Sequence, residues 1–164
     1  MRSLTLSTLI LTLGLVACGG GGADSGDMSP DEAKAAAREA FDDGNYADAE
    51  KHYTNALDGV AKDDSGYLEL KVEHLQALSH VNGEKALEQV KELKDQLKAD
   101  QFRKVGLDLF SGGAYVEAAH VMDLGNKAYP DDEQMVSFTE KMVEQIKEKG
   151  GEEGASALAG LGYF

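Results

Sequence analysis

Few side chains in this sequence are suited to covalent or nucleophilic chemistry. The 164 residues include one cysteine, four histidines and no tryptophan. A single cysteine excludes a disulfide within the chain. No two histidines stand three or four residues apart, which is the spacing of paired metal ligands on a helix. The sequence also has no nucleophile motif and no Gly-rich phosphate loop after a strand. We therefore predict no enzyme, no cofactor and no metal site.

Basic residues are scarce as well. Lys and Arg number 16 against 30 Asp and Glu, and the formal net charge is −14. A chain this acidic repels nucleic acid and anionic lipid headgroups, so we predict that neither is a main partner. Solubility is the explanation of the acidity that we favour.

Proline is rare in the sequence and strand-like patterns are missing, and both facts favour helices. The two prolines are Pro30 and Pro130, placed where a helix begins and where one has just ended. Ser29 is a suitable N-cap, and Glu32 completes a capping box. No alternating run of β-branched residues is long enough for a sheet. The sequence predicts an all-α domain over residues 30–149.

The N-terminal segment has the layout of an export signal. Arg2 precedes an uncharged stretch, 4–16, that is too short to span a bilayer comfortably. Leu15-Val16-Ala17-Cys18 resembles the lipobox of bacterial lipoproteins. The resemblance implies a signal peptide at 1–17 and a lipid, including palmitate-type acyl chains, on Cys18 that anchors the chain in a membrane. The alternative is an ordinary cleaved signal with a chance cysteine.

Two Gly-rich segments flank the predicted domain. Residues 18–29 comprise the predicted lipidated Cys18 and a flexible Gly-rich tether. Gly19 stands where Asp would resemble an inner-membrane retention signal, which favours the outer membrane with the protein facing the periplasm of a bacterial envelope. At the other end, Gly150-Gly151 ends the last periodic segment, and we expect residues 150–164 to be a flexible tail.

The sequence repeats itself at a shift of 69 residues. The matched pairs include Ala37 with Gly106, Phe41 with Phe110, Gly44 with Gly113, Tyr46 with Tyr115 and Ala49 with Ala118. The later copy, Phe102-x2-Val105-Gly106-x2-Leu109, resembles the tetratricopeptide consensus, whose period is about half of this shift.

The resemblance implies a tetratricopeptide-like solenoid of helical hairpins. Its three hairpins would cover about 30–62, 64–98 and 99–130, and a capping helix would follow from Asp131 to Lys149. The alternative is a plain helical bundle with accidental similarity.

The resemblance also implies a binding groove along the first helix of each hairpin. A cation stands twelve residues before each predicted turn residue (Lys34, Lys71 and Arg103), and Arg38 and Lys104 lie beside them. With Phe41 and Phe110, these residues form the candidate protein- or peptide-binding site. A basic groove would favour an acidic segment or a terminal carboxylate. Carboxylate-clamp relatives use Asn where this chain has Leu75 and Leu107, so we predict a mixed apolar and basic groove. The alternative is that the cations pair with nearby acids and only solvate the helices.

These features together predict a lipid-anchored envelope protein that binds other proteins as an adaptor or assembly scaffold. The expected partner is an envelope protein or peptide, together with the membrane through Cys18. A second hypothesis is a structural lipoprotein that self-associates, its C-terminal tail docking in a neighbour's groove.

Overall fold

The computed structural model describes residues 28–164, which form eight α-helices and no strand. The predicted signal peptide, Cys18 and most of the tether lie outside the described residues. The all-α prediction is confirmed. The helices are α1 (Pro30–Asp42), α2 (Tyr46–Asp58), α3 (Tyr67–Val81), α4 (Gly83–Leu93), α5 (Ala99–Ser111), α6 (Tyr115–Ala128), α7 (Glu133–Lys149) and α8 (Gly151–Gly160).

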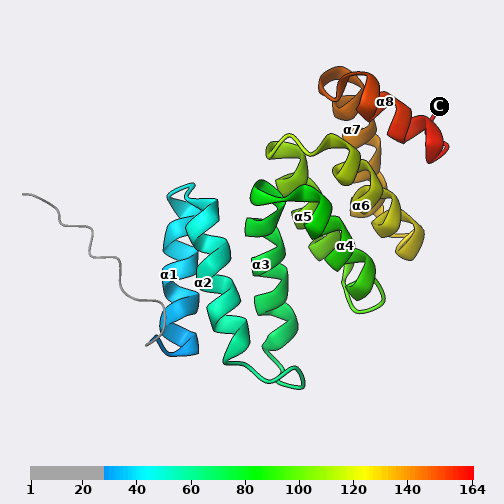
Figure 1. Ribbon diagram of the computed structural model, residues 1–164. Helices are drawn as coiled ribbons and strands as arrows, with labels where there is room; N and C mark the ends of the chain where they lie inside the picture. The colour runs from blue at the N-terminus through cyan, green and yellow to red at the C-terminus, as the bar shows by residue number, and fades with distance from the viewer. Residues whose placement is uncertain (1–27) are drawn as a thin grey trace, which may run out of the picture.

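The helices form a row of hairpins, as Figure 1 shows from α1 in blue to α8 in red. The pairs α1–α2, α3–α4 and α5–α6 match the three predicted hairpins. Successive hairpins pack through α2 against α3, α3 against α5 and α4 against α6. Each hairpin thus contacts its neighbours in the row, which is the arrangement of a helical solenoid.

The N-terminus of α1 follows the predicted capping box. The Glu32 amide donates to Ser29 Oγ at 3.4 Å, and the Ser29 amide donates to Glu32 Oε2 at 2.9 Å. Pro30 occupies the first helical turn, where its missing N–H removes no helical hydrogen bond. These local signals fix where the first hairpin begins.

The turns of the first and third hairpins have the same backbone structure. Gly44 has φ +75° and Gly113 has φ +83°, a left-handed conformation that favours glycine. In the first turn, the Asn45 amide donates to the Ala40 carbonyl at 2.8 Å. The equivalent bond in the third runs from Ala114 to Leu109 at 2.9 Å. Both turns are Schellman motifs. The repeat at a shift of 69 is therefore a repeat of structure.

The middle hairpin closes in a different way. A single residue, Asn82, separates α3 from α4, and its side chain caps α4 by accepting from the Lys85 amide at 3.0 Å. Three residues separate the helices in the first hairpin and in the third. The shorter turn changes the register of α3 relative to the predicted repeat.

The expectation of a flexible tail at 150–164 is wrong. Residues Gly151–Gly160 form α8, which packs on α6 and α7 and makes a fourth hairpin with α7. Leu158 is fully buried, and Gly154 lets α8 approach Ile146, whose Cγ2 would lie 3.0 Å from an added Cβ. The predicted capping helix exists as α7 but is not the end of the array. The small residues of this segment allow α8 to pack closely, and α6 and α7 provide the surface against which α8 is buried.

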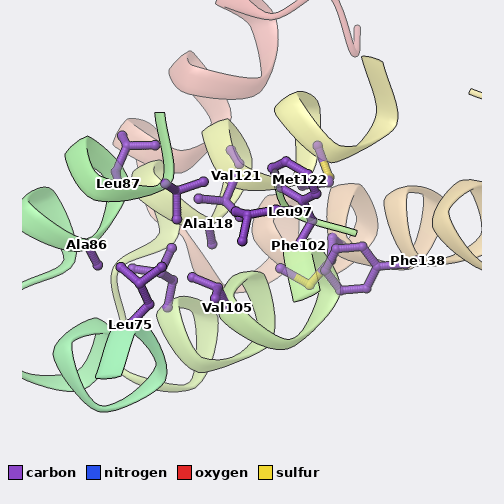
Figure 2. Close-up of a cluster of buried hydrophobic side chains, with 14 of the residues drawn as sticks. Leu75, Ala86, Leu87, Leu97, Phe102, Val105, Ala118, Val121, Met122 and Phe138 are labelled. Carbon is purple, nitrogen blue, oxygen red and sulfur yellow. The ribbon is translucent and has the colours of Figure 1, made fainter. Parts of the chain in front are cut away.

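Two hydrophobic clusters lie inside the array. The larger one joins the second, third and fourth hairpins, and Figure 2 shows Leu75, Phe102, Val105 and Met122 converging in it. The smaller one occupies the first hairpin and reaches α3 only through Leu70 and Ala77. The first hairpin therefore packs on α3 through its own cluster, which is built mainly of alanines and is separate from the larger one.

Candidate functional site

Three of the predicted groove cations lie near the solvent side of the first helices, and each has a carboxylate partner. Arg38 on α1 makes a double contact with Glu73 on α3, with Nε donating to Oε2 at 3.0 Å and Nη2 pairing with Oε1. The guanidinium is 52% exposed and the carboxylate 18%. This bidentate pair links the first hairpin to the second.

Arg103 makes a similar link between the third hairpin and the fourth. Its Nη1 lies 3.4 Å from Asp132 Oδ1, and its Nη2 donates to Gln134 Oε1 at 2.8 Å. Asp132 is also the N-cap of α7, accepting from the Met135 amide at 2.7 Å. Arg103 therefore lies where α7 begins and helps to hold that helix beside α5.

Lys104 pairs with Asp100 one turn earlier on its own helix, at 3.7 Å. Both side chains are more than 45% exposed. This is the local i, i+4 pairing that the alternative interpretation predicts. With Arg38 and Arg103 also paired, the positive charge of these three residues is balanced by acids.

The structure does not bring all five predicted cations together. Lys34 lines a cavity of about 190 Å³ between α1 and the α2–α3 connection, where Asp31 and Asp64 also lie. Lys71 lines a different cavity, enclosed by α2, α3 and α4. The physical reason for the position of Lys71 is the one-residue turn at Asn82. Counting twelve residues back from Gly83 reaches the side of α3 that faces α2 and α4.

Phe41 and Phe110 are partly buried at the turn ends of their hairpins. Phe41 packs edge-on against Tyr46 with ring centroids 5.2 Å apart, and Phe110 packs in the same way against Tyr115 at 5.2 Å. The ring of His80 stacks on Tyr46 at 3.7 Å. Both phenylalanines therefore take part in packing at the ends of the hairpins.

A polar contact between α3 and α5 was missed by the sequence analysis. Gln76 Nε2 donates to Asp108 Oδ2 at 2.8 Å, and His80 Nε2 lies 3.3 Å from Asp108 Oδ1. Burial raises the pKa of the Asp108 carboxyl, and the two hydrogen bonds oppose that shift. The one signal in the sequence was the i, i+4 spacing of Gln76 and His80, which needs the true register of α3 to be informative.

Leu107 and Leu75, the two positions that depart from the carboxylate-clamp pattern, differ in exposure. Leu75 is fully buried in the larger hydrophobic cluster. Leu107 on α5 is 49% exposed and lies one turn after Arg103 and Lys104. An apolar side chain beside paired charges resembles the composition of a protein interface, with an anchor inside a polar rim.

Residues 28–164 contain no cluster of three His, Cys, Asp or Glu side chains arranged to hold a metal ion. Among the same residues, no helix combines the length and apolar character needed to cross a bilayer. Comparisons with models of known protein families, with curated proteins and with solved structures give no match. The function of the chain is therefore inferred below from its sequence and from the arrangement of its side chains.

Proposed function

We propose that this protein is a lipid-anchored adaptor or assembly scaffold of the bacterial envelope, belonging to the tetratricopeptide type. Support for the anchor comes from the lipobox-like sequence ending at Cys18. Support for a binding role comes from the row of helical hairpins, a form that typically offers an extended surface to peptides and proteins.

The exposed position of Leu107 is the observation that carries the binding role. Leu107 is 49% exposed, about as much as Val81, but it lies beside charged side chains that already have partners, which gives this part of α5 an apolar centre with a polar rim. Its neighbours Arg103 and Lys104 are already held by acids, so a partner would not need to neutralise them. We therefore propose a partner segment that inserts an apolar side chain at Leu107 and forms hydrogen bonds around it, in place of a strongly acidic peptide.

A photo-crosslinking amino acid placed at Leu107 tests this proposal in intact cells. The matched control places the same group at Glu88, an exposed position on α4. We expect a specific envelope protein to be captured from position 107 and not from position 88. When the crosslinking group is placed at a distant position, we expect the Leu107→Asp substitution to abolish capture of the same partner. Equal capture from both positions, or none from 107, would contradict the proposal. Unfolding of purified Leu107→Asp by heat provides the folding control.

The anchor is tested separately by metabolic labelling with a palmitate analogue. We expect label on the native chain and its recovery with membranes, and loss of both in Cys18→Ala. An unlabelled native chain that still leaves the cytoplasm would instead identify an ordinary cleaved signal. This result would leave the proposed binding surface untouched.

Self-association is the second candidate function, and the exposed ring of Phe164 is the observation that favours it. Phe164 is 69% exposed, with Lys147 Nζ 4.2 Å from the ring centroid. The rest of the C-terminal segment packs on its own chain, where the Tyr163 hydroxyl lies 3.3 Å from Asp123 Oδ1. A mass in sedimentation that rises with concentration, and that falls to the monomer in Phe164→Ser, would favour this candidate over the adaptor.

A further inference from the structure

A cavity of about 450 Å³ lies between the first and second hairpins. Its walls come from α2, the α2–α3 connection, α3 and α4. Lys62, Lys71 and Lys85 all line it, and none of the three forms an ion pair with another residue in 28–164. Three unpaired lysines at one cavity contrast with a chain whose net charge is −14.

The lysines come from three separate elements, so no single helix surface explains their convergence. Lys62 lies in the α2–α3 connection, Lys71 on α3 and Lys85 on α4. Burial lowers the pKa of Lys71, and the nearby charges of Lys85 and Lys62 act in the same direction, against the attraction of Glu92 and Glu50. A bound anion would relieve this repulsion, which gives anion binding a favourable electrostatic term.

Two acids also line the cavity, and one of them is already engaged. Glu50 Oε1 lies 3.4 Å from His74 Nε2, and the Thr54 hydroxyl lies 3.4 Å from the same nitrogen. The other acid is Asp58, at the C-terminal end of α2. Among the lining residues the three lysines outnumber the two carboxylates, while Glu92 acts on Lys71 from outside the lining.

The cavity also has buried polar atoms without partners. His74 is 4% exposed, and its Nδ1 has no hydrogen-bond partner, nor does the buried Oε1 of Gln89. Buried polar atoms in folded proteins are nearly always satisfied. With its Nε2 turned to Glu50, a neutral His74 ring offers Nδ1 as an acceptor, and the amide oxygen of Gln89 is an acceptor too. Both atoms are covered by the protein itself, so a ligand in the cavity does not reach them.

We propose that this cavity binds a small phosphate ester, with its phosphate among Lys62, Lys71 and Lys85. Lysines act as point charges and suit a compact multiply charged phosphate, whereas planar carboxylates are better matched by the arginine fork. The volume lies within the range of small-molecule sites. Tyr67, Leu57 and Val60 supply an apolar edge for the carbon skeleton.

The proposed site is separate from Leu107 and extends the function beyond protein binding. Its ligand would contact α2 of the first hairpin and both helices of the second. Binding would therefore stabilise the docking of the first hairpin, which has the smaller hydrophobic cluster.

Isothermal titration calorimetry of the full mature chain with glycerol 3-phosphate tests the proposal. We expect saturable binding that weakens with added salt and that falls at least about tenfold in Lys71→Met and in Lys85→Gln. Lys91→Met, an exposed lysine on α4 outside the cavity lining, is the matched control and should bind as the native chain does. Lys85 is exposed, so its substitution keeps the test valid if Lys71→Met fails to fold.

Other probes define what would overturn the proposal. Absence of saturable binding, equal loss in Lys91→Met, or succinate binding as tightly as glycerol 3-phosphate would each contradict the phosphate site. Inorganic phosphate binding as tightly as the ester would overturn the role given to the apolar edge. Leu107→Asp should leave glycerol 3-phosphate binding unchanged, so failure here and failure of the adaptor role are distinguishable.

Discussion

The first and third hairpins share one backbone design but differ in what fills them. Their turns have the same glycine conformation and the same hydrogen bonds. At equivalent positions, however, Ala33 of the first hairpin corresponds to Phe102 of the third, and Ala40 to Leu109. The comparison shows that one turn geometry accommodates different cores: alanines around Tyr53 in the first hairpin, and larger side chains such as Phe102 and Leu109 in the third.

The two hairpins also differ in how they are held. The third is surrounded by apolar contacts in the larger cluster, while the first depends on a smaller cluster and on polar links such as Arg38–Glu73 and His74–Glu50. Polar links at partly exposed sites contribute less than apolar burial. We expect α1 and α2 to open at a lower free energy than α5 and α6, as local unfolding reports it.

The largest expected loss of stability comes from a substitution in the core of the third hairpin. Phe102→Ala removes a fully buried ring and should lower the free energy of unfolding by about 3–5 kcal/mol in urea denaturation. At the equivalent position, Ala33→Gly should cost only about 1 kcal/mol, from helix propensity. Equal losses at the two positions would contradict the proposed difference in packing.

A second substitution tests the small residues that the two hairpins share. A Cβ on Gly125 would lie 2.8 Å from Phe102 Cβ, which cannot move without its helix, so Gly125→Ala should cost about 1–3 kcal/mol. Ala56 already fills the equivalent position in the first hairpin, and Ala56→Gly should cost about 1 kcal/mol. Thermal unfolding of both variants measures this, and a neutral Gly125→Ala would mean that α6 and α5 are less tightly packed.

The ion pair that docks the first hairpin should have a smaller effect. A double-mutant cycle with Arg38→Met and Glu73→Gln should give a coupling of about 0.2–1 kcal/mol, because the guanidinium is half-exposed. Hydrogen exchange should become faster in α1 and α2 and stay unchanged in α5 and α6. Faster exchange across the whole array would show that the hairpins unfold together.

The smallest expected effect is a dependence on pH at the junction of the first two hairpins. Burial, followed by the charge of Lys71, lowers the pKa of His74. As the pH falls, His74 therefore binds a proton in the unfolded chain before it does so in the folded chain. This difference lowers the free energy of unfolding as the pH falls below about 6.5. Comparison of urea unfolding at about pH 7.5 and about pH 5.5 should show a smaller difference in His74→Gln than in the native chain. An identical difference would exclude His74 as the cause.

The sequence predicted the parts of the fold that depend on local chemistry. The capping box at Ser29 and the glycines at 44 and 113 act within one turn of the chain, so the boundaries of the first and third hairpins follow from them. The side of α3 that carries Lys71 depends on the one-residue turn at Asn82, which no local pattern distinguishes from a longer one.

The remaining features depend on contacts between distant residues. The partner of Arg38 lies 35 positions away, and the burial of Leu158 is supplied by α6 and α7. The lysine cavity likewise joins residues from three elements that have no shared spacing in the sequence. Residues 150–164 were predicted to be a tail because Gly and Ala side chains bury little apolar surface. The same small side chains allow the close approach that α8 requires.

The uneven packing of the row has a mechanical consequence. The proposed membrane anchor precedes α1, so a pull between the membrane and a partner held at α5 passes first through the docking of the first hairpin. At that junction the first hairpin packs on α3 through a cluster built mainly of alanines and through the Arg38–Glu73 pair. When the chain is pulled from its N-terminus, we expect α1 and α2 to extend first and a partner held at α5 to stay in place.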